Sequence, residues 1–393
     1  DPDIFNVNLS LARWDTKRLY NFFDYVLSGD KFIELSEKYT VTIATHSSPE
    51  KLHSLVEVSQ HWTGPISVSV FTLAEEFLVT ELYIAYLRQC FHQVRDQISF
   101  HLVYPHDYPP INYINSTFNY NYSCENPESV LSELMKHRNS RIIELKNKML
   151  YPQNHLRNHA RRNCKTEYIF LTDVDIIPST GMAEVLDEFL RKSKCEKLCA
   201  YVIPVYEMSE NVSFPQNKSE MIKLANNGLA RPFHQKIYAD GHFSTNYSSW
   251  EKNTGDVKAA VHVNHNVTRC TNWYEPFYVA RAIVPDYDER FIGYGFTRNT
   301  QVLVSLLLLC TNKSFRFFLN IFIFLCLSKV YEMIAAGYQF QVLSPIFACH
   351  WGLQTVEGDY NPWRRKQVST NSRLIRTFKT EVNARYGNVI KMC

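Results

Sequence analysis

The sequence YIFLTDVD at residues 168–175 joins an apolar run to two aspartates, Asp173 and Asp175. Because successive side chains of a strand point to opposite faces, we expect both carboxylates on one face, where the strand end aims them at one cation. Oxygen ligands of this kind suit Mg²⁺ or Mn²⁺, whose open positions are usually filled by substrate phosphates. The alternative, which a bare DxD motif leaves open, is a strand end with two solvated acids.

Extended and helical patterns alternate before this stretch. Extended runs cover residues 41–44, 66–71 and 100–104, and helical runs begin at Ser48-Pro49, end at Cys90, open at Pro127 and cover residues 153–163. This alternation predicts an α/β fold with a mainly parallel sheet flanked by helices. Ligands of such sheets bind beyond the carboxyl ends of the strands, where Asp173 and Asp175 fall.

Composition limits the class of protein. A chain of 393 residues with 45% hydrophobic residues is long enough for one large domain or two smaller ones with a packed core. The net charge of +3, with no basic run longer than residues 161–162 or 364–366, gives no reason to expect a nucleic-acid partner. Ten cysteines form no CxxC pair, which argues against a zinc ribbon or a redox motif.

Glycosylation sequons indicate the lumen of the secretory pathway. They lie at Asn8, Asn115, Asn121, Asn211, Asn217, Asn246, Asn266 and Asn312. We therefore expect some cysteines to be disulfide-bonded. The alternative is an Asn-rich cytosolic protein whose sequons are accidental. Since the chain begins at Asp1 without an initiator Met or an apolar leader, we expect it to be a fragment that lacks any signal or anchor.

The segment 302–329, VLVSLLLLCTNKSFRFFLNIFIFLCLSK, differs from its surroundings because it is apolar and holds no acidic residue. Its apolar runs reach about half of the ~20 residues that a membrane span requires. A buried hairpin is one interpretation. We favour a translated intron, because Val302 fits a codon with GT, the Phe-rich end fits a pyrimidine tract and Lys329 fits a codon that ends in AG.

Removal of this segment joins Gln301 to Val330 and restores an amphipathic helical pattern, TQVYEMIAAGYQF. It also lowers the net charge from +3 to 0 and the number of cysteines from ten to eight. We expect the insertion to displace the helix that follows Val330 and, with it, the strand that carries His350.

Seven motifs resemble glycosyltransferase family 49 when they are taken in order. They are HWTGPISVSVF (61–71), YPQNHLRNHARR (151–162), FLTDVDIIPS (170–179), GHFSTNYSSW (241–250), WYEPFYVAR (273–281), YDERFIGYGF (287–296) and ACHWG (348–352). The resemblance covers most of the chain. It implies a GT-A fold, which is a Rossmann-like mixed sheet with flanking helices, in a single catalytic domain.

The resemblance also implies a domain organisation and partners. A stem at 1–38 would precede the GT-A domain at 39–393, with a nucleotide-sugar half at 39–198 and an acceptor half at 199–393. The implied partners are a UDP-sugar donor, a glycan or glycoprotein acceptor and Mn²⁺, with Mg²⁺ as the alternative ion. The implied location is the Golgi membrane, with a lumenal catalytic domain and a type II anchor before Asp1, and no oligomeric state is implied.

Family 49 implies a role for several residues of this chain. The expected metal ligands are Asp173, Asp175 and His350, and the expected donor-binding residues are Arg157, Asn158, Asp173, Gly293 and Gly295. A lone His is more often structural than metal-bound, Arg157 has the alternative of an exposed helix face, and turn geometry alone explains the two glycines nearly as well.

The general base stays open at this point. Inverting transfer needs a base for the acceptor hydroxyl, and Asp288 and Glu289 are the nearest acids to the glycine turn, with Glu275 as a further candidate. Related enzymes often carry an acidic pair directly after such a turn, where this chain has Thr297 and Arg298. Asp288 or Glu289 capping the turn is the structural alternative.

The expected reaction is β-1,4-glucuronyltransferase-like transfer from UDP-glucuronate in the protein O-mannosyl glycosylation of dystroglycan. The donor carboxylate favours an Arg or Lys partner, for which the sequence offers Arg161, Arg162, Arg231 and Lys236. The alternatives are a UDP-N-acetylglucosamine β-1,3-N-acetylglucosaminyltransferase and a non-catalytic glycan-binding relative. An aspartyl-phosphate phosphotransferase is disfavoured, because three strand-like runs precede Asp173.

Overall fold

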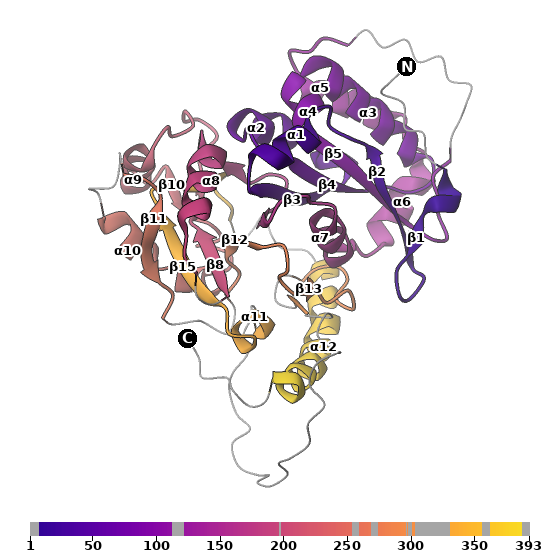
Figure 1. Cartoon of the computed structure of the whole chain (residues 1–393). Helices are drawn as coiled ribbons and strands as arrows, with labels where there is room; N and C mark the ends of the chain where they lie inside the picture. The colour runs from indigo at the N-terminus through magenta and orange to yellow at the C-terminus, as the bar shows by residue number, and fades with distance from the viewer. Residues whose placement is uncertain are drawn as a thin grey trace.

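A mixed ten-stranded sheet organises the chain in the computed structural model (Figure 1), which describes residues 8–111, 122–195, 198–253, 259–268, 274–295, 297, 301–302, 331–355 and 362–386. The strands are β1 (Arg13–Trp14), β2 (Tyr20–Leu27), β3 (Val41–Ser47), β4 (Ile66–Phe71), β5 (Ile98–Pro105), β6 (Tyr168–Leu171), β7 (Ile177–Pro178), β8 (Cys199–Ile203), β9 (Val205–Met208), β10 (Ala230–Pro232), β11 (His262–Asn266), β12 (Phe277–Arg281), β13 (Asp286–Tyr287), β14 (Gln301–Val302), β15 (Gln339–Ser344) and β16 (Ala348–Trp351).

Helices cover the sheet and connect its strands. The α-helices are α1 (Phe32–Lys38), α2 (Ser54–His61), α3 (Glu76–Cys90), α4 (His92–Gln97), α5 (Pro127–Lys136), α6 (Ser140–Lys148), α7 (Gln153–Arg162), α8 (Met182–Lys192), α9 (Lys218–Asn226), α10 (Tyr247–Lys252), α11 (Tyr331–Ala335) and α12 (Pro362–Tyr386). Short 3₁₀ helices are η1 (Leu9–Leu11), η2 (Pro49–Lys51), η3 (Ala239–Gly241) and η4 (Phe243–Thr245).

The strand order of the large sheet is β1-β2-β5-β4-β3-β6-β12-β8-β15-β11. The pairings β5/β4, β4/β3 and β3/β6 are parallel, and β12 is inserted antiparallel between β6 and β8. The predicted α/β class with a mixed sheet and flanking helices is therefore confirmed. The sheet includes residues before 39, because β2, which lies within the expected stem 1–38, pairs with β5.

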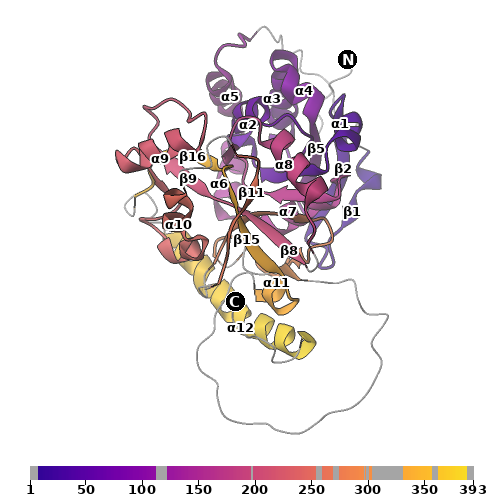
Figure 2. The ribbon, with the colours of Figure 1, turned by 60° about the vertical axis from the view of Figure 1, so that its left-hand side comes forward.

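A second sheet, β10-β9-β16-β7, joins segments that are far apart in the sequence. Figure 2 shows β9 and β16 beside α9. β16 pairs in parallel with β9 and antiparallel with β7, so that Cys349 lies opposite both Tyr206 and Ile177. Because β7 closely follows the DxD motif, this pairing carries the late strand with His350 to the carboxyl end of β6.

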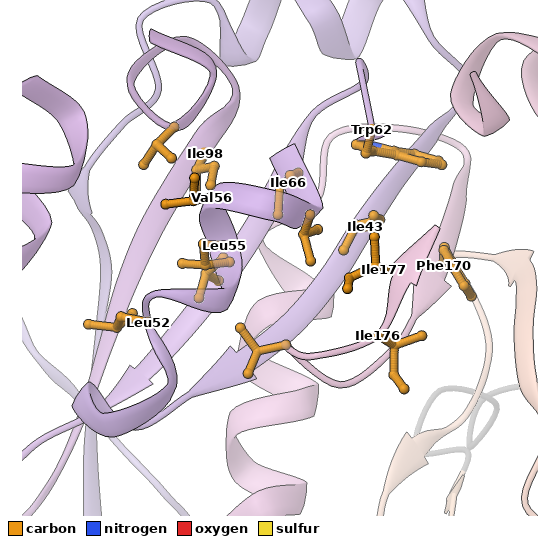
Figure 3. Packing of buried hydrophobic residues seen from close by; sticks show 14 of the residues in the cluster. Ile43, Leu52, Leu55, Val56, Trp62, Ile66, Ile98, Phe170, Ile176 and Ile177 are labelled. Atoms are coloured by element: carbon orange, nitrogen blue, oxygen red, sulfur yellow. The ribbon is translucent and has the colours of Figure 1, made fainter. Parts of the chain in front are cut away.

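The two faces of the large sheet are buried in different ways. On one face, α2 packs Leu55 and Val56 against strand residues such as Ile43 and Ile66 (Figure 3). On the other face lies α7, of whose ten residues eight are buried although most of them are polar. A polar helix is stable at such a place when its polar groups find hydrogen-bond partners.

Strand β4, with the sequence ISVSVF, contributes side chains to both faces of the large sheet. Its apolar residues Ile66, Val68 and Val70 belong to the core under α2, whereas Ser67 and Ser69 face α7. Ser67 Oγ donates to the Ala160 carbonyl at 2.7 Å, and Ser69 Oγ lies 2.8 Å from His159 Nδ1. The alternation of apolar residues and serines is typical of a strand with one face in water. Here both faces of the strand are buried, because the serines bind the helix.

Two disulfides, Cys90–Cys124 and Cys195–Cys199, confirm the expectation that some cysteines are bonded. Within the described part of the chain, no helix combines the length and the apolar composition that a membrane crossing requires.

The suspected intron lies outside the described residues, apart from Val302 in β14. The expectation that it displaces the following elements is wrong. After it, α11 forms at Tyr331–Ala335, β15 pairs in parallel with β8, and His350 keeps its place opposite Glu207. Backbone pairing with β8 and β9 fixes both strands independently of the preceding segment.

We predict that Ser67→Val lowers the free energy of unfolding by about 2–4 kcal/mol, because it removes the bond to α7 and adds volume to a filled interface. Chemical denaturation monitored by fluorescence measures the change. Ser28→Val, at an exposed position after β2, is the control and should stay within about 0.5 kcal/mol of the wild type. Equal losses for the two variants would contradict the proposed contact.

Candidate active site

The two aspartates lie in a turn after β6 and not within the strand. β6 ends at Leu171, and the Ile176 amide closes the turn by donating to the Asp173 carbonyl at 3.1 Å. The expectation that Asp173 and Asp175 share one face of a strand is therefore wrong in its geometry. Both nevertheless lie beyond the carboxyl end of a parallel strand, where ligands of such sheets bind.

Asp175 faces His350 from the second sheet. Its Oδ2 lies 3.7 Å from His350 Nε2 and 3.5 Å from Lys51 Nζ. Burial alone raises the pKa of Asp175, but the His350 imidazole and the Lys51 ammonium outweigh it, so the pKa lies below its usual value. Asp175 is thus an anion at neutral pH, with an imidazole facing it.

Asp173 faces a different set of side chains. Its Oδ1 lies 3.6 Å from the Arg157 guanidinium and 3.7 Å from His46 Nε2. His46 in turn lies 3.0 Å from the Tyr151 hydroxyl through its Nδ1. The carboxylate is therefore oriented by groups from β3 and α7.

A partly buried ion cluster anchors the 3₁₀ helix that carries Lys51. Glu50 accepts from Arg138 at 2.6 Å and from Lys146 at 2.7 Å, and both cations also bind the buried Glu76. Burial of Glu50 raises its pKa, but the charge and hydrogen bond of Lys146 more than reverse this and lower the pKa to about 2. The cluster fixes the backbone from which Lys51 reaches Asp175.

The predicted metal ligands do not form one closed group. Asp175 and His350 face each other, whereas Asp173 faces Arg157. Across the residues that the structure describes, no group of three or more His, Cys, Asp or Glu side chains is arranged to hold a metal ion. By donor type, the carboxylate and imidazole of the facing pair fit Mn²⁺, and Asp173 is the adjacent oxygen donor.

Arg157 and Asn158 are both buried, so the exposed-face alternative for Arg157 is excluded. Arg157 reaches Asp173 and stacks over the Tyr287 ring at 5.4 Å. Asn158 binds the backbone of Tyr287 on both sides, since its Nδ2 donates to the carbonyl at 2.8 Å and its Oδ1 accepts from the amide at 2.7 Å. Asn158 therefore positions the segment that carries Asp288 and Glu289.

Both candidate bases line a cavity of about 430 Å³ beside α12. Asp288 accepts from Arg290 at 2.6 Å, and Arg290 also donates to Glu381 at 2.9 Å. Glu289 accepts from Asn158 at 3.0 Å. Asn158, which binds Glu289, and Arg157, which reaches Asp173, are neighbours on α7. Because successive residues of an α-helix are rotated by about 100°, their side chains leave the helix in different directions.

The glycine turn packs against α12. Gly293 and Gly295 have φ values of +81° and +90°, and a Cβ on Gly295 would lie 2.8 Å from the Val368 side chain. Asn371 donates to the Gly295 carbonyl at 2.8 Å. The turn geometry and the contact with α12 together require glycine here, as the structural alternative stated.

The arginines considered for the donor carboxylate have partners within the chain. Arg161 and Arg162 both pair with Asp286, and Arg231 pairs with Glu207. Sequence reasoning missed Lys51 and His46. The signal for them was position alone, because both fall at or just after the carboxyl end of β3, the first strand of the alternation.

The chain matches the model of a known family over most of its length. The model of the family described as "Glycosyl-transferase for dystroglycan" matches residues 40–387. The chain belongs to glycosyltransferase family 49. As a family 49 member with relatives named as glucuronyltransferases, it is a glycosyltransferase.

Several relatives share most of this family 49 chain. Beta-1,4-glucuronyltransferase 1 of Mus musculus is 32% identical over 359 residues, which cover 90% of this chain and 77% of the relative. The Homo sapiens protein of the same name is 31% identical with the same coverage. Xylosyl- and glucuronyltransferase LARGE2s of Danio rerio is 26% identical over 272 residues, which cover 67% of this chain and 28% of the relative.

We predict that Asn158→Ala destabilises the protein by about 2–3 kcal/mol, because it leaves the buried amide and carbonyl of Tyr287 without their partner. Hydrogen exchange measured by mass spectrometry should show faster exchange at residues 286–290 than elsewhere. Asn227→Ala, at the exposed end of α9, is the control and should change neither quantity. Unchanged exchange at 286–290 would disprove the positioning role.

Proposed function

We propose that this chain is an Mn²⁺-dependent inverting glucuronyltransferase that transfers glucuronate from UDP-glucuronate to a glycan acceptor. The observation that carries the proposal is the ionised Asp175 facing His350 beyond the carboxyl end of β6. The names of the relatives support glucuronate as the transferred sugar.

The leaving group of this reaction is a diphosphate, on which negative charge develops. When bound, a divalent cation supplies charge stabilisation for it. Asp175 and His350 would hold the cation, with Asp173 as the neighbouring oxygen donor. Arg157 keeps Asp173 oriented, and the buried Glu50 cluster keeps Lys51 in place.

Lys51 is the best candidate partner for an anionic group of the donor. Its ammonium lies 3.5 Å from Asp175, and its side chain is 56% exposed. In contrast, Arg161, Arg162 and Arg231 are paired with buried or partly buried carboxylates. A donor phosphate or the glucuronate carboxylate that reaches Lys51 shares this exposed ammonium with Asp175.

The acceptor hydroxyl needs a base, for which we retain Asp288 and Glu289. Arg290 holds the Asp288 carboxylate to α12 at 2.6 Å, whereas Glu289 accepts from Asn158 and lies 3.8 Å from both Arg162 and His155. The Glu289 side chain is 21% exposed and that of Asp288 only 6%, so Glu289 is more accessible to an acceptor hydroxyl and is the stronger candidate.

We also propose that the protein works in the Golgi lumen, held there by a membrane anchor outside this chain. Support comes from the sequons at Asn8, Asn211, Asn246 and Asn266, whose side chains are exposed, and from the two disulfides.

We predict that the purified protein releases UDP from UDP-glucuronate in the presence of Mn²⁺, and does so faster than from UDP-N-acetylglucosamine. Asp175→Asn should abolish release while leaving the melting temperature unchanged within a few degrees, because the carboxylate acts through its charge. Glu167→Gln, at a half-exposed acid before β6, is the control. Equal activity in EDTA would refute the metal role, and a preference for UDP-N-acetylglucosamine would refute the donor.

For the base, we predict that Glu289→Gln lowers turnover by about 10² to 10⁴, with metal and UDP binding retained. Asp288→Asn should lower the melting temperature, because it weakens the ion pair with Arg290. Steady-state kinetics and calorimetric UDP titration separate these effects. If neither variant loses tenfold in turnover, both assignments are wrong.

A further inference from the structure

A second cavity, of about 600 Å³, lies in the C-terminal half of the chain between β10, η3, η4, α10 and β11. The reaction proposed above gives this cavity no role. Its volume lies in the range of sites for small organic ligands.

The wall of this cavity adjoins the proposed metal site. Phe233, which directly follows β10, lines the cavity, and its ring centroid lies 5.5 Å from that of His350. β10 pairs with β9, and β9 pairs with the strand that carries His350, so cavity wall and imidazole belong to one sheet. A ligand in the cavity is therefore separated from the His350 imidazole by the Phe233 ring.

The cavity presents an aromatic ring to solvent. Phe243, on η4, is 68% exposed although it is a large apolar side chain. Gln235, Ser244 and Ser248 also line the cavity and supply neutral groups that can form hydrogen bonds with a ligand. The C–H face of a pyranose packs against an aromatic ring, while its hydroxyls bind neutral polar side chains, so this combination suits a sugar.

Charge separates this cavity from the one beside α12. Among the described residues that line the larger cavity there is no Asp, Glu, Lys or Arg. The smaller cavity is lined by several acidic and several basic side chains, including Asp288 and Arg290. Two histidines, His242 and His265, also line the larger cavity, and burial lowers the pKa of His265, which disfavours its charged form. A uronate or a phosphate would lose its hydration here without gaining a counter-charge.

We propose that this cavity binds an uncharged sugar unit of the acceptor glycan, with Phe243 as its stacking platform. The acceptor role rests on the proposed transferase function. The donor, which is anionic, is bound at the aspartate turn, and the neutral acceptor is bound on the far side of Phe233.

One competing occupant is visible in the sequence. Asn246 and Asn266 both line the cavity, both are exposed, and both lie in sequons. A glycan attached to either would occupy the cavity from the protein's own chain. Asn246 also caps α10, since its side chain accepts from the Ser249 amide at 3.3 Å. The test must therefore establish whether these positions are modified.

The experiment measures sugar binding by saturation-transfer NMR on the full chain secreted from animal cells. The probes are the p-nitrophenyl β-xyloside, β-glucoside, β-galactoside and β-N-acetylglucosaminide, with the β-glucuronide as the charged counterpart. We expect at least one neutral probe to bind, the glucuronide not to bind, and Phe243→Ala to weaken binding about tenfold.

Two control variants locate the binding. Ile283→Ala removes an equally exposed apolar side chain away from both cavities, and Trp14→Ala alters the cavity beside α12. Both should bind the neutral probe like the wild type. Loss of binding in Trp14→Ala, wild-type binding in Phe243→Ala, or binding of the glucuronide as tight as that of the neutral probes would overturn the proposal. A glycan found on Asn246 or Asn266 by mass spectrometry would overturn it too.

UDP release without acceptor separates this proposal from the proposed function. We expect Phe243→Ala to release UDP from UDP-glucuronate at the wild-type rate, because the aspartate turn is intact. If the wild type releases no UDP, the transferase proposal fails, while Phe243-dependent binding still establishes a neutral-sugar site. If release is normal and binding does not depend on Phe243, the cavity proposal alone fails.

Discussion

The burial of a polar helix is the constraint on which the rest of the structure depends. Helix α7 has the sequence QNHLRNHARR, and almost all of it is inaccessible to water. Each buried polar group needs a partner, and the partners come from three directions: the serines of β4, the turn after β6, and the backbone of Tyr287. The arrangement of the candidate site follows from these contacts, because the same helix holds Asp173 and the segment of the candidate bases.

Much of the fold was predictable from local pattern, since β3, β4, β5 and β6 have apolar runs of the right length between helical periods. The later strands of the sheet were not, because β12 and β15 owe their places to pairing with distant strands. Ser67 and Ser69 show the limit of alternation as a signal. The sequence alone does not distinguish a serine that binds a helix carbonyl from one that faces water.

The site was predictable in its residues more than in its geometry. The aspartates stand out as a pair after a strand, and His350 came from family resemblance, yet the turn that separates Asp173 from Asp175 has no signature in sequence. Lys51 and His46 are single polar residues that belong to no motif with a characteristic spacing. For Asp288, the partner Arg290 is only two residues away, but Arg290 is itself held by Glu381 on α12, about ninety residues later, which adjacency in sequence did not reveal.

The pairing of β16 between β9 and β7 has a consequence for how the chain tolerates change. The orientation of His350 is set by its register, and a shift of one residue would turn Cys349 or Trp351 toward Asp175 instead. An insertion or deletion of one residue between β15 and β16 would therefore take the imidazole away from Asp175 even if both strands still formed.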